Sequence, residues 1–461
     1  MVHGLSLIHS GETGDAQWWE LPGAEDAHRP EGLRIRFSCG RQKSQYFLYL
    51  GILMKASENK AVETTRSRMT ASAKVLFSSM VVAGLVAACG GGGHTNTTTA
   101  MTTPPPPPTI TKALWIANGT NVLEYLPNQL TGGVSTANPH VTIASGAFGA
   151  PQGVTFDSKG NLWVMDPAAT VNGVANTPAL LEFSAAQLAA LGTNAAPMPV
   201  ATITTQTLAF PQQAVFDAQG NLWVTDHNAN NVLVFTPNQL ALTGANMLAP
   251  AVVLTSPSFN GPLGIVFDGK GNLFVANNGG VPNAQGGMSA VGTSIVEFNA
   301  AKLQNPAAML APDASFNDNG ANTIQAPWAL TFDNNGDLWS SNSGGTFTLV
   351  KFAKADLAKP NATTPMPTVT ISPTNVPLMG AANNVVPSLV APNGICFDNL
   401  FDLAAADADS PFGIAFYKNN QLTSGAVLPN TFFADLPATI TAGTPTPLNA
   451  PAGCNFGPLI N

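Results

Sequence analysis

One short frame recurs along this chain and limits its fold more than any other feature does. In each copy a phenylalanine stands five residues after a proline, as in PQGVTFD at 151–157. The frame returns as PQQAVFD from 211, PLGIVFD from 262, PWALTFD from 327 and PNGICFD from 392. Such self-similarity is typical of repeat architectures, in which each copy forms one supersecondary unit.

Each copy continues into further short apolar runs. The second run reads LWVMD, LWVTD, LFVAN, LWSSN and LAAAD in successive copies, and the third reads LLEFSAAQL, VLVFTPNQL, IVEFNAAKL, LVKFAKADL and IAFYKNNQL. A fourth run, such as ATIT at 201, VTIS at 369 or ATIT at 438, often closes the unit. Four strands of this length make one antiparallel blade. Because GVTF and NLWV lack polar alternation, we expect strands that are buried on both faces.

The two ends of the repeat array complement each other. LWIAN at 114 and VLEYLPNQL at 122 are second and third runs with no first run before them, and PAGCNFG at 451–457 supplies that first run at the far end. The sequence therefore predicts an all-β, six-bladed β-propeller over residues 113–461, with four-stranded antiparallel blades. The C-terminal strand would be the inner strand of the N-terminal blade and would close the ring. An open solenoid is the alternative, but it needs no split unit.

A short export signal precedes the repeats. Lys74 is followed by an apolar run at 75–88, whose 14 residues would span only about 21 Å as a helix, less than a hydrocarbon core of about 30 Å. This length is typical of a signal peptide, which we place at 69–88. The sequence VAAC at 86–89 resembles the bacterial lipobox, which implies a lipid-modified Cys89. An ordinary signal peptide with an incidental cysteine is the alternative.

The export signal also sets the expected domain boundaries. A signal peptide stands at the start of a nascent chain, so we interpret residues 1–68 as a mis-assigned extension; a poorly structured extension is the alternative. Residues 89–112, rich in Gly, Thr and Pro, predict a flexible tether. We expect a protein of the bacterial cell envelope, bound to the membrane through Cys89. Gly90 after the cysteine resembles outer-membrane lipoproteins and implies the outer membrane or cell surface.

Charge excludes one class of partner. From Cys89 onward the chain has eight lysines, no arginine and 18 acidic residues. A groove that follows nucleic-acid phosphates needs the opposite balance, so we expect no nucleic acid partner.

The repeat resembles the NHL family, whose units read P-x-G-[IV]-x-x-D-x-x-G-N-[LI]-[YW]-V-[AT]-D, and the resemblance covers residues 113–461. It implies a six-bladed propeller that binds proteins, peptides or small ligands, although related propellers include lactonases and lyases. A fold of this kind does not by itself decide the function.

Six polar residues end the second runs, one in each blade, and are expected on the same face of the ring. They are Asn118, Asp166, Asp226, Asn277, Asn342 and Asp407, and His227 lies beside this Asp/Asn ring. They could bind a polar ligand or a divalent metal near the axis. In the alternative interpretation they cap turns outside the channel. The D-x-x-G-N sequence between the first two runs predicts a turn rather than a calcium loop, because it lacks the further carboxylates.

Two functions remain open at this point. Long loops at 167–178, 279–293 and 372–390 leave the same face as the Asp/Asn ring and favour a non-catalytic binding scaffold for an unknown protein, peptide or small molecule. The alternative is a metal-dependent lactonase- or lyase-like enzyme that uses the ring. No nucleophile, zinc or histidine–carboxylate motif supports catalysis, so we predict no catalytic residues and no required cofactor.

Cys396 and Cys454 are the only cysteines of the repeat region. They stand one position apart in the repeat frame, so their side chains point to opposite faces of adjacent inner strands. The thiols would either converge across the closure of the ring, as a disulfide, or point apart as two buried thiols.

Overall fold

The computed structural model describes strands at 5–10, 16–17 and 45–50, and then residues 111–135, 137–279, 293–304, 309–318, 323–358, 366–377, 385–409, 413–434 and 448–459. The chain divides into two compact units, Met1–Pro105 and Pro106–Asn461. The first has a three-stranded antiparallel sheet in which β1 (Leu5–Ser10) pairs with both β2 (Ala16–Gln17) and β3 (Gln45–Leu50).

The predicted signal peptide, Cys89 and nearly all of the tether lie outside the described residues, and these features stay predictions. Within the described part of the chain, no helix has the length and apolar character needed to cross a bilayer.

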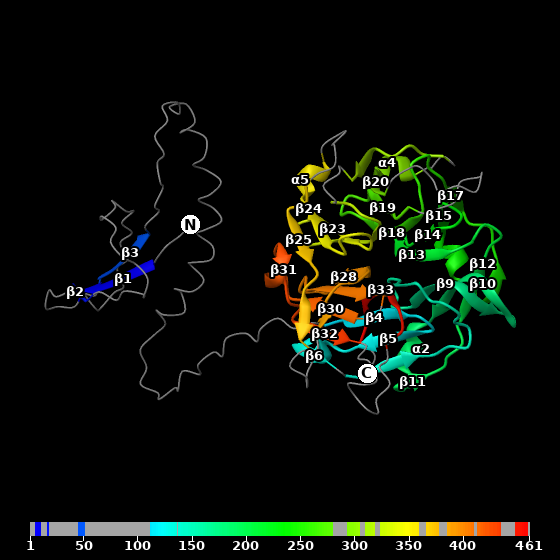
Figure 1. The fold of residues 1–461 in the computed structure, drawn as a ribbon, viewed down its shortest axis with the longest axis horizontal. Coiled ribbons are helices and arrows are strands. Elements are labelled where there is room, and N and C mark those ends of the chain that lie inside the picture. The colour runs from blue at the N-terminus through cyan, green and yellow to red at the C-terminus, as the bar shows by residue number, and fades with distance from the viewer. Residues whose placement is uncertain are drawn as a thin grey trace, which may run out of the picture. The chain divides into compact units, whose positions relative to one another are not determined.

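The second unit is a ring of six mainly antiparallel sheets, which confirms the predicted six-bladed propeller (Figure 1). From the axis outward, the first three blades are β33 (Pro451–Gly457), β4 (Ala113–Asn118), β5 (Asn121–Tyr125) and β7 (Val141–Ile143); β8 (Gly153–Phe156), β9 (Leu162–Val171), β10 (Val174–Phe183) and β12 (Ala201–Thr204); and β13 (Pro211–Phe216), β14 (Leu222–Asp226), β15 (Asn231–Phe235) and β17 (Val252–Leu254).

The last three blades repeat this order. They are β18 (Pro262–Phe267), β19 (Leu273–Asn277), β20 (Ser294–Phe298) and β21 (Ala314–Asn317); β22 (Pro327–Phe332), β23 (Leu338–Asn342), β24 (Leu349–Phe352) and β25 (Val369–Ser372); and β28 (Pro392–Phe397), β29 (Leu403–Asp407), β30 (Gly413–Tyr417) and β32 (Thr431–Ala434). In the sixth blade the outer strand is TFFA at 431–434 instead of the expected ATIT at 438, which lies outside the described residues. Phe432 and Phe433 are each 2% exposed, so this strand buries two large apolar side chains.

Aromatic residues of the repeat connect neighbouring blades. The phenylalanine of one frame packs edge-on against the second-strand aromatic ring of the preceding blade. The centroids lie 5.5 Å apart for Trp115 and Phe156, 5.6 Å for Trp223 and Phe267, 5.3 Å for Phe274 and Phe332, and 6.0 Å for Trp339 and Phe397. Each such pair contributes about 0.5–1.5 kcal/mol beyond its buried area.

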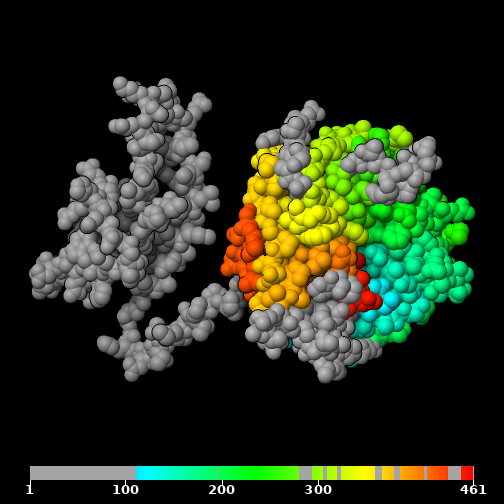
Figure 2. Space-filling model, in the orientation of Figure 1, coloured from blue at the N-terminus to red at the C-terminus, as the bar shows by residue number. Residues whose placement is uncertain are grey.

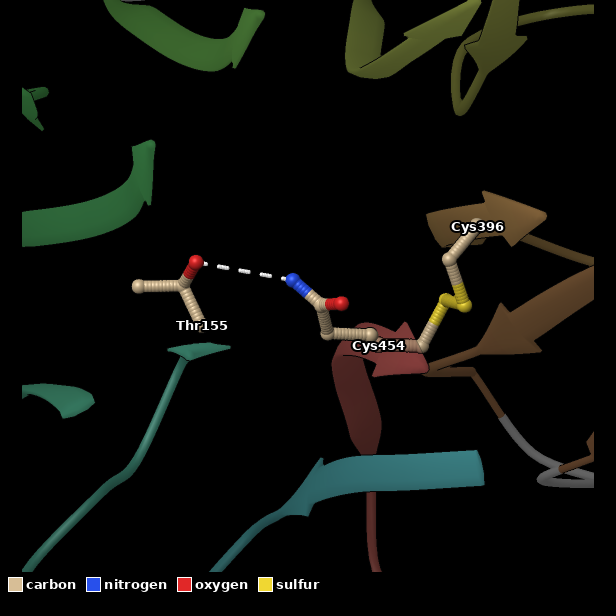
Figure 3. The surroundings of a disulfide bond; sticks show 4 residues. Thr155, Cys396 and Cys454 are labelled. Atoms are coloured by element: carbon tan, nitrogen blue, oxygen red, sulfur yellow. Dashed lines mark hydrogen bonds between the residues drawn. A yellow bond between two sulfur atoms is a disulfide. The ribbon is translucent and has the colours of Figure 1, made fainter. Parts of the chain in front are cut away.

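The C-terminal strand closes the ring as predicted. β33 pairs with β4 in antiparallel register, with Cys454 opposite Ile116, and the red C-terminal residues lie between the cyan first blade and the orange sixth blade (Figure 2). Cys396 and Cys454 form a disulfide across this closure, with their Cα atoms 5.9 Å apart (Figure 3).

The connectors between third and outer strands contain an element that the repeat did not predict. After one helical turn, such as α2 (Ala185–Ala189) or α3 (Pro237–Leu240), the connector runs parallel to the outer strand of the preceding blade. We call these segments clasp strands. They are β6 (Gly133–Ser135) on β32, β11 (Asn194–Ala195) on β7, β16 (Gly244–Met247) on β12, β31 (Gly425–Ala426) on β25, and a single bridge from Met309 to Thr255. Each clasp strand covers hydrogen-bonding groups at the edge of a neighbouring sheet.

Candidate functional site

Five residues of the Asp/Asn ring end their second strands at one face, which we call the upper rim. Asp166 instead lies within β9, because β9 and β10 continue beyond it as a paired hairpin where the sequence predicted a loop at 167–178. All six are at most 2% exposed: Asn118, Asp166, Asp226, Asn277 and Asn342 are at 0% and Asp407 is at 2%. Except for Asp166, each pairs with the proline that begins the inner strand of its own blade, as Asp226 does with Pro211.

Each of the three carboxylates accepts two backbone hydrogen bonds from the loop before the inner strand and a third from the N–H group two or three residues after itself. Asp226 accepts from the N–H groups of Ala209 at 2.6 Å, Phe210 at 2.8 Å and Ala229 at 3.1 Å. Asp166 and Asp407 each accept three such bonds in their own blades. Burial raises the pKa of Asp166 and Asp226 although these amides lower it, and it raises the pKa of Asp407 to about 6.

The three carboxamides each accept a hydrogen bond from the loop before the inner strand, and Asn277 and Asn342 also donate to it. Asn277 accepts from Asn260 N–H at 3.0 Å and donates to the Ser258 carbonyl and the Ser294 hydroxyl, both at 2.9 Å. Asn342 and Asn118 likewise accept from the N–H groups of Gln325 and Asn449. Amide and carboxylate therefore serve one purpose in different blades, which is to hold the loop before the inner strand.

These contacts are the ones that the turn-capping interpretation requires. Each residue of the ring contacts the loop of its own blade, and these contacts do not join one ring residue to another. Within the described ranges, no group of three or more His, Cys, Asp and Glu side chains could hold a metal ion. A direct ligand-binding role for the Asp/Asn ring stays a prediction.

His227, beside the ring, is half-buried on the upper rim between the third and fourth blades. Its Nδ1 lies 2.8 Å from Asn228 Oδ1, and its ring centroid is 6.4 Å from that of Phe210. Its Nε2 approaches Gly261 so closely that a Cβ there would lie 2.8 Å away. Gly261 is the residue just before the inner strand of the fourth blade, so His227 contacts two blades at once.

Asparagine side chains extend this contact around the rim. Asn230 donates to the Phe259 carbonyl at 3.1 Å and accepts from Gly261 N–H at 3.0 Å, which links the third blade to the fourth. Asn278 donates to the Ala326 carbonyl at 3.0 Å and to Ser343 Oγ at 3.3 Å, which links the fourth blade to the fifth. Loops held in this way present a defined surface, which favours recognition by shape.

The fifth blade also holds two non-glycine residues with left-handed backbone. Ala326 has φ 46° and Phe347 has φ 50°. Such conformations cost of order 1–3 kcal/mol and gather at binding sites and clamps. Phe347 is half-buried, and so is Trp328, two residues after Ala326. We call the rim formed by His227, Asn278, Ala326, Trp328 and Phe347 the recognition strip.

Sequence inspection missed a second group of polar residues, at the position directly after the frame proline. Gln212 is 3% exposed and Asn393 is 6% exposed, both on inner strands. Asn393 Oδ1 has no hydrogen-bond partner among the described residues. The available signal was a Gln or Asn in a strand that is otherwise apolar, a substitution that packing alone does not require.

Comparison with known proteins gives structural neighbours only. No family model matches the chain, and no curated protein matches its sequence. Among solved structures, it is similar to a catalytically inactive virginiamycin B lyase from Staphylococcus aureus, with 14% identity over 74% of this chain and 77% of that one and a TM-score of 0.33. It is also similar to a streptogramin B lyase structure, with 13% identity over 67% and 87% of the two chains and a TM-score of 0.36. A protein of unknown function from Bacteroides caccae shares 15% identity over 56% of this chain and 79% of its own, with a TM-score of 0.35. At this level of similarity these neighbours say nothing about the activity of this chain.

Proposed function

We propose that this protein is an envelope lipoprotein, tethered through Cys89, whose propeller binds a partner at the upper rim without catalysing a reaction. The observation that carries the proposal is the hydrogen bonding of the Asp/Asn ring. Both carboxylate oxygens of Asp226, for example, accept hydrogen bonds from backbone N–H groups. They thereby hold loops in place rather than face a substrate.

The recognition strip supports the same proposal. His227 and Trp328 are half-buried, so each combines a packed body with a face that a partner could contact. Aromatic side chains on a rigid rim supply large contact area at low entropic cost and are enriched at binding hot spots. A protein or peptide segment is therefore the favoured class of partner.

The binding experiment compares two faces of the same propeller. The double variant His227→Ala/Trp328→Ala should lose capture of a cross-linked partner in envelope extracts, while Lys159→Ala/Lys270→Ala, on exposed turns of the opposite face, should retain it. Equal capture by both variants, with unchanged melting temperatures, would place the binding surface elsewhere.

The tether has its own test. Cys89→Ala should release the protein from membranes in soluble form, because acyl chains contribute about 0.8 kcal/mol for each buried CH₂. Gly90→Asp is the matched variant: it should keep the lipid and the membrane association and change only the membrane to which the protein is sorted. Membrane retention of Cys89→Ala would contradict lipid attachment at this residue.

The metal-dependent hydrolase or lyase is the competing function. Purified protein that carries a stoichiometric divalent metal, and that turns over members of a lactone panel until a chelator is added, would overturn the non-catalytic proposal.

A further inference from the structure

Methionine occupies an unusual place on this propeller. Among the described methionines, Met198, Met247, Met309 and Met366 are 60%, 72%, 68% and 60% exposed, whereas Met165 is fully buried. All four exposed residues lie in the connector between the third and outer strands of their blade, one to three residues before a proline. Four successive blades thus present a thioether to solvent from the same part of the repeat.

The contacts that hold Met198, Met247 and Met309 use the main chain. Met247 lies in clasp strand β16, paired with Thr204, and Met309 forms the bridge to Thr255. The Met198 carbonyl accepts from Gln187 Nε2 at 2.9 Å. Because the backbone is anchored and the side chains are exposed, the sulfur atoms can change chemically without loss of these contacts.

No free thiol of the propeller competes for oxidants. Thiols normally react ahead of thioethers, but the two cysteines after residue 89 are joined in the disulfide between Cys396 and Cys454. The most accessible reduced sulfur atoms of the described propeller are therefore those of the four exposed methionines.

We propose that Met198, Met247, Met309 and Met366 are oxidation sites that consume hypohalous acid at the surface of the propeller. The sulfur lone pair attacks the halogen of the acid and hydroxide leaves. Water then adds to the halosulfonium sulfur, halide departs and protons are released, which leaves a sulfoxide. The sulfur loses two electrons, the halogen gains them, and a methionine sulfoxide reductase with a thiol donor can restore the thioether.

The fold should survive this change at the four sites but not at Met165. A sulfoxide is polar, and an exposed position lets water solvate it. Met165 instead packs among buried residues that include Trp163, Leu180 and Leu222. A sulfoxide there would place a strongly polar S–O group in a tightly packed apolar cluster, away from water. This inference does not depend on the binding function proposed above.

The test first alkylates the purified full-length chain, so that Cys39 and Cys89 carry no free thiol. It then titrates the chain with hypochlorous acid, reads each methionine by peptide mass spectrometry, and measures the melting temperature at each dose. We expect the four exposed sites to reach half conversion at a dose roughly tenfold or more below that for Met165. The melting temperature should stay unchanged until Met165 reacts. Conversion of Met165 in step with the four sites, or an early loss of melting temperature, would overturn the proposal.

Two leucine variants complete the test, since leucine keeps an apolar side chain of similar volume. With Met198, Met247, Met309 and Met366 all changed to Leu, Met165 should oxidise and the protein should lose its melting transition at a lower dose. Met165→Leu is the control and should leave the order of reaction at the four sites unchanged. If Met165 is oxidised at the same dose in the fourfold variant as in the parent, the exposed methionines do not protect it and the proposal fails.

Discussion

At the scale of single residues, Asp166 shows how one buried carboxylate organises a rim loop. It accepts from the N–H groups of Gly149 at 2.8 Å, Ala150 at 2.9 Å and Ala168 at 2.9 Å. Asp166→Ala should lower the free energy of unfolding by about 2–4 kcal/mol, because three donors lose their acceptor. Asp166→Asn should cost less than half as much, since three other blades use Asn at this position. Urea unfolding measures both, and equal losses would mean that this loop needs both carboxylate oxygens as acceptors.

Two glutamates at the same position of their third strands predict that the protein becomes less stable as the pH rises, the opposite of what a carboxylate with a lowered pKa would cause. Burial, then the negative charge of Asp157, raises the pKa of Glu182 from 4.5 to about 7, and burial, then Asp268 and Asp313, does the same for Glu297. The folded state therefore holds protons that the unfolded chain has released, so stability should fall as pH rises from about 4.5 to 7. The contribution is on the order of 1–3 kcal/mol for each group.

Thermal melts at pH 5 and pH 8 measure this effect. The parent should melt at the lower temperature at pH 8, and Glu182→Gln/Glu297→Gln should reduce the difference. A double variant with the same pH dependence as the parent would rule out these two carboxyls as its source.

The positions of the site residues could be predicted from sequence, but their contacts could not. The repeat alone places Asp226 and its counterparts at the ends of second strands. In five blades the loop N–H partners lie 16 or 17 residues earlier, in loops of different sequence, and for Asn118 the partner is Asn449, 331 residues later. Only the folded loop decides whether a side chain turns toward it or toward the axis.

At the scale of elements, the inner strands approach so closely that side chains are excluded at one position. A Cβ added to Gly394 would lie 2.5 Å from the Ala452 carbonyl oxygen and 3.0 Å from Cys454 N, on the neighbouring strand. Gly394→Ala should therefore destabilise the protein by about 1–3 kcal/mol through overpacking. Gly269→Ala is the control, because no heavy atom lies within 4 Å of its added Cβ. Denaturant unfolding compares the two, and equal stabilities would show that the strands separate easily.

The repeated frame from proline to phenylalanine predicted the first strand of each blade, and the two apolar runs after it predicted the second and third. The clasp strands escaped prediction for a physical reason. Segments such as NA at 194 and GA at 425 are short, with little β propensity. They become strands because they pair with the outer strand of another blade. That pairing depends on the tertiary structure and leaves no pattern in the segments themselves.

At the scale of the whole molecule, the disulfide joins the last blade to the closing strand and encloses a loop of 58 residues in sequence separation. In the chain-entropy model such a cross-link contributes roughly 4 kcal/mol. Reduction should lower the melting temperature, and Cys396→Ser/Cys454→Ser should melt at the temperature of the reduced parent and be insensitive to reductant. A variant as stable as the oxidised parent would show that the bond adds nothing to the closure.

The clasp strands also bear on how such a chain could have grown. Each unit carries its own outer strand, and in five of the six units the described part of the connector also holds a segment that covers the outer strand of the unit before it. Duplicating one unit in a gene therefore adds one sheet edge and one cover together. The number of blades can therefore change by one unit at a time. Which numbers are stable depends on whether the ring closes, and not on whether the sheet edges are covered.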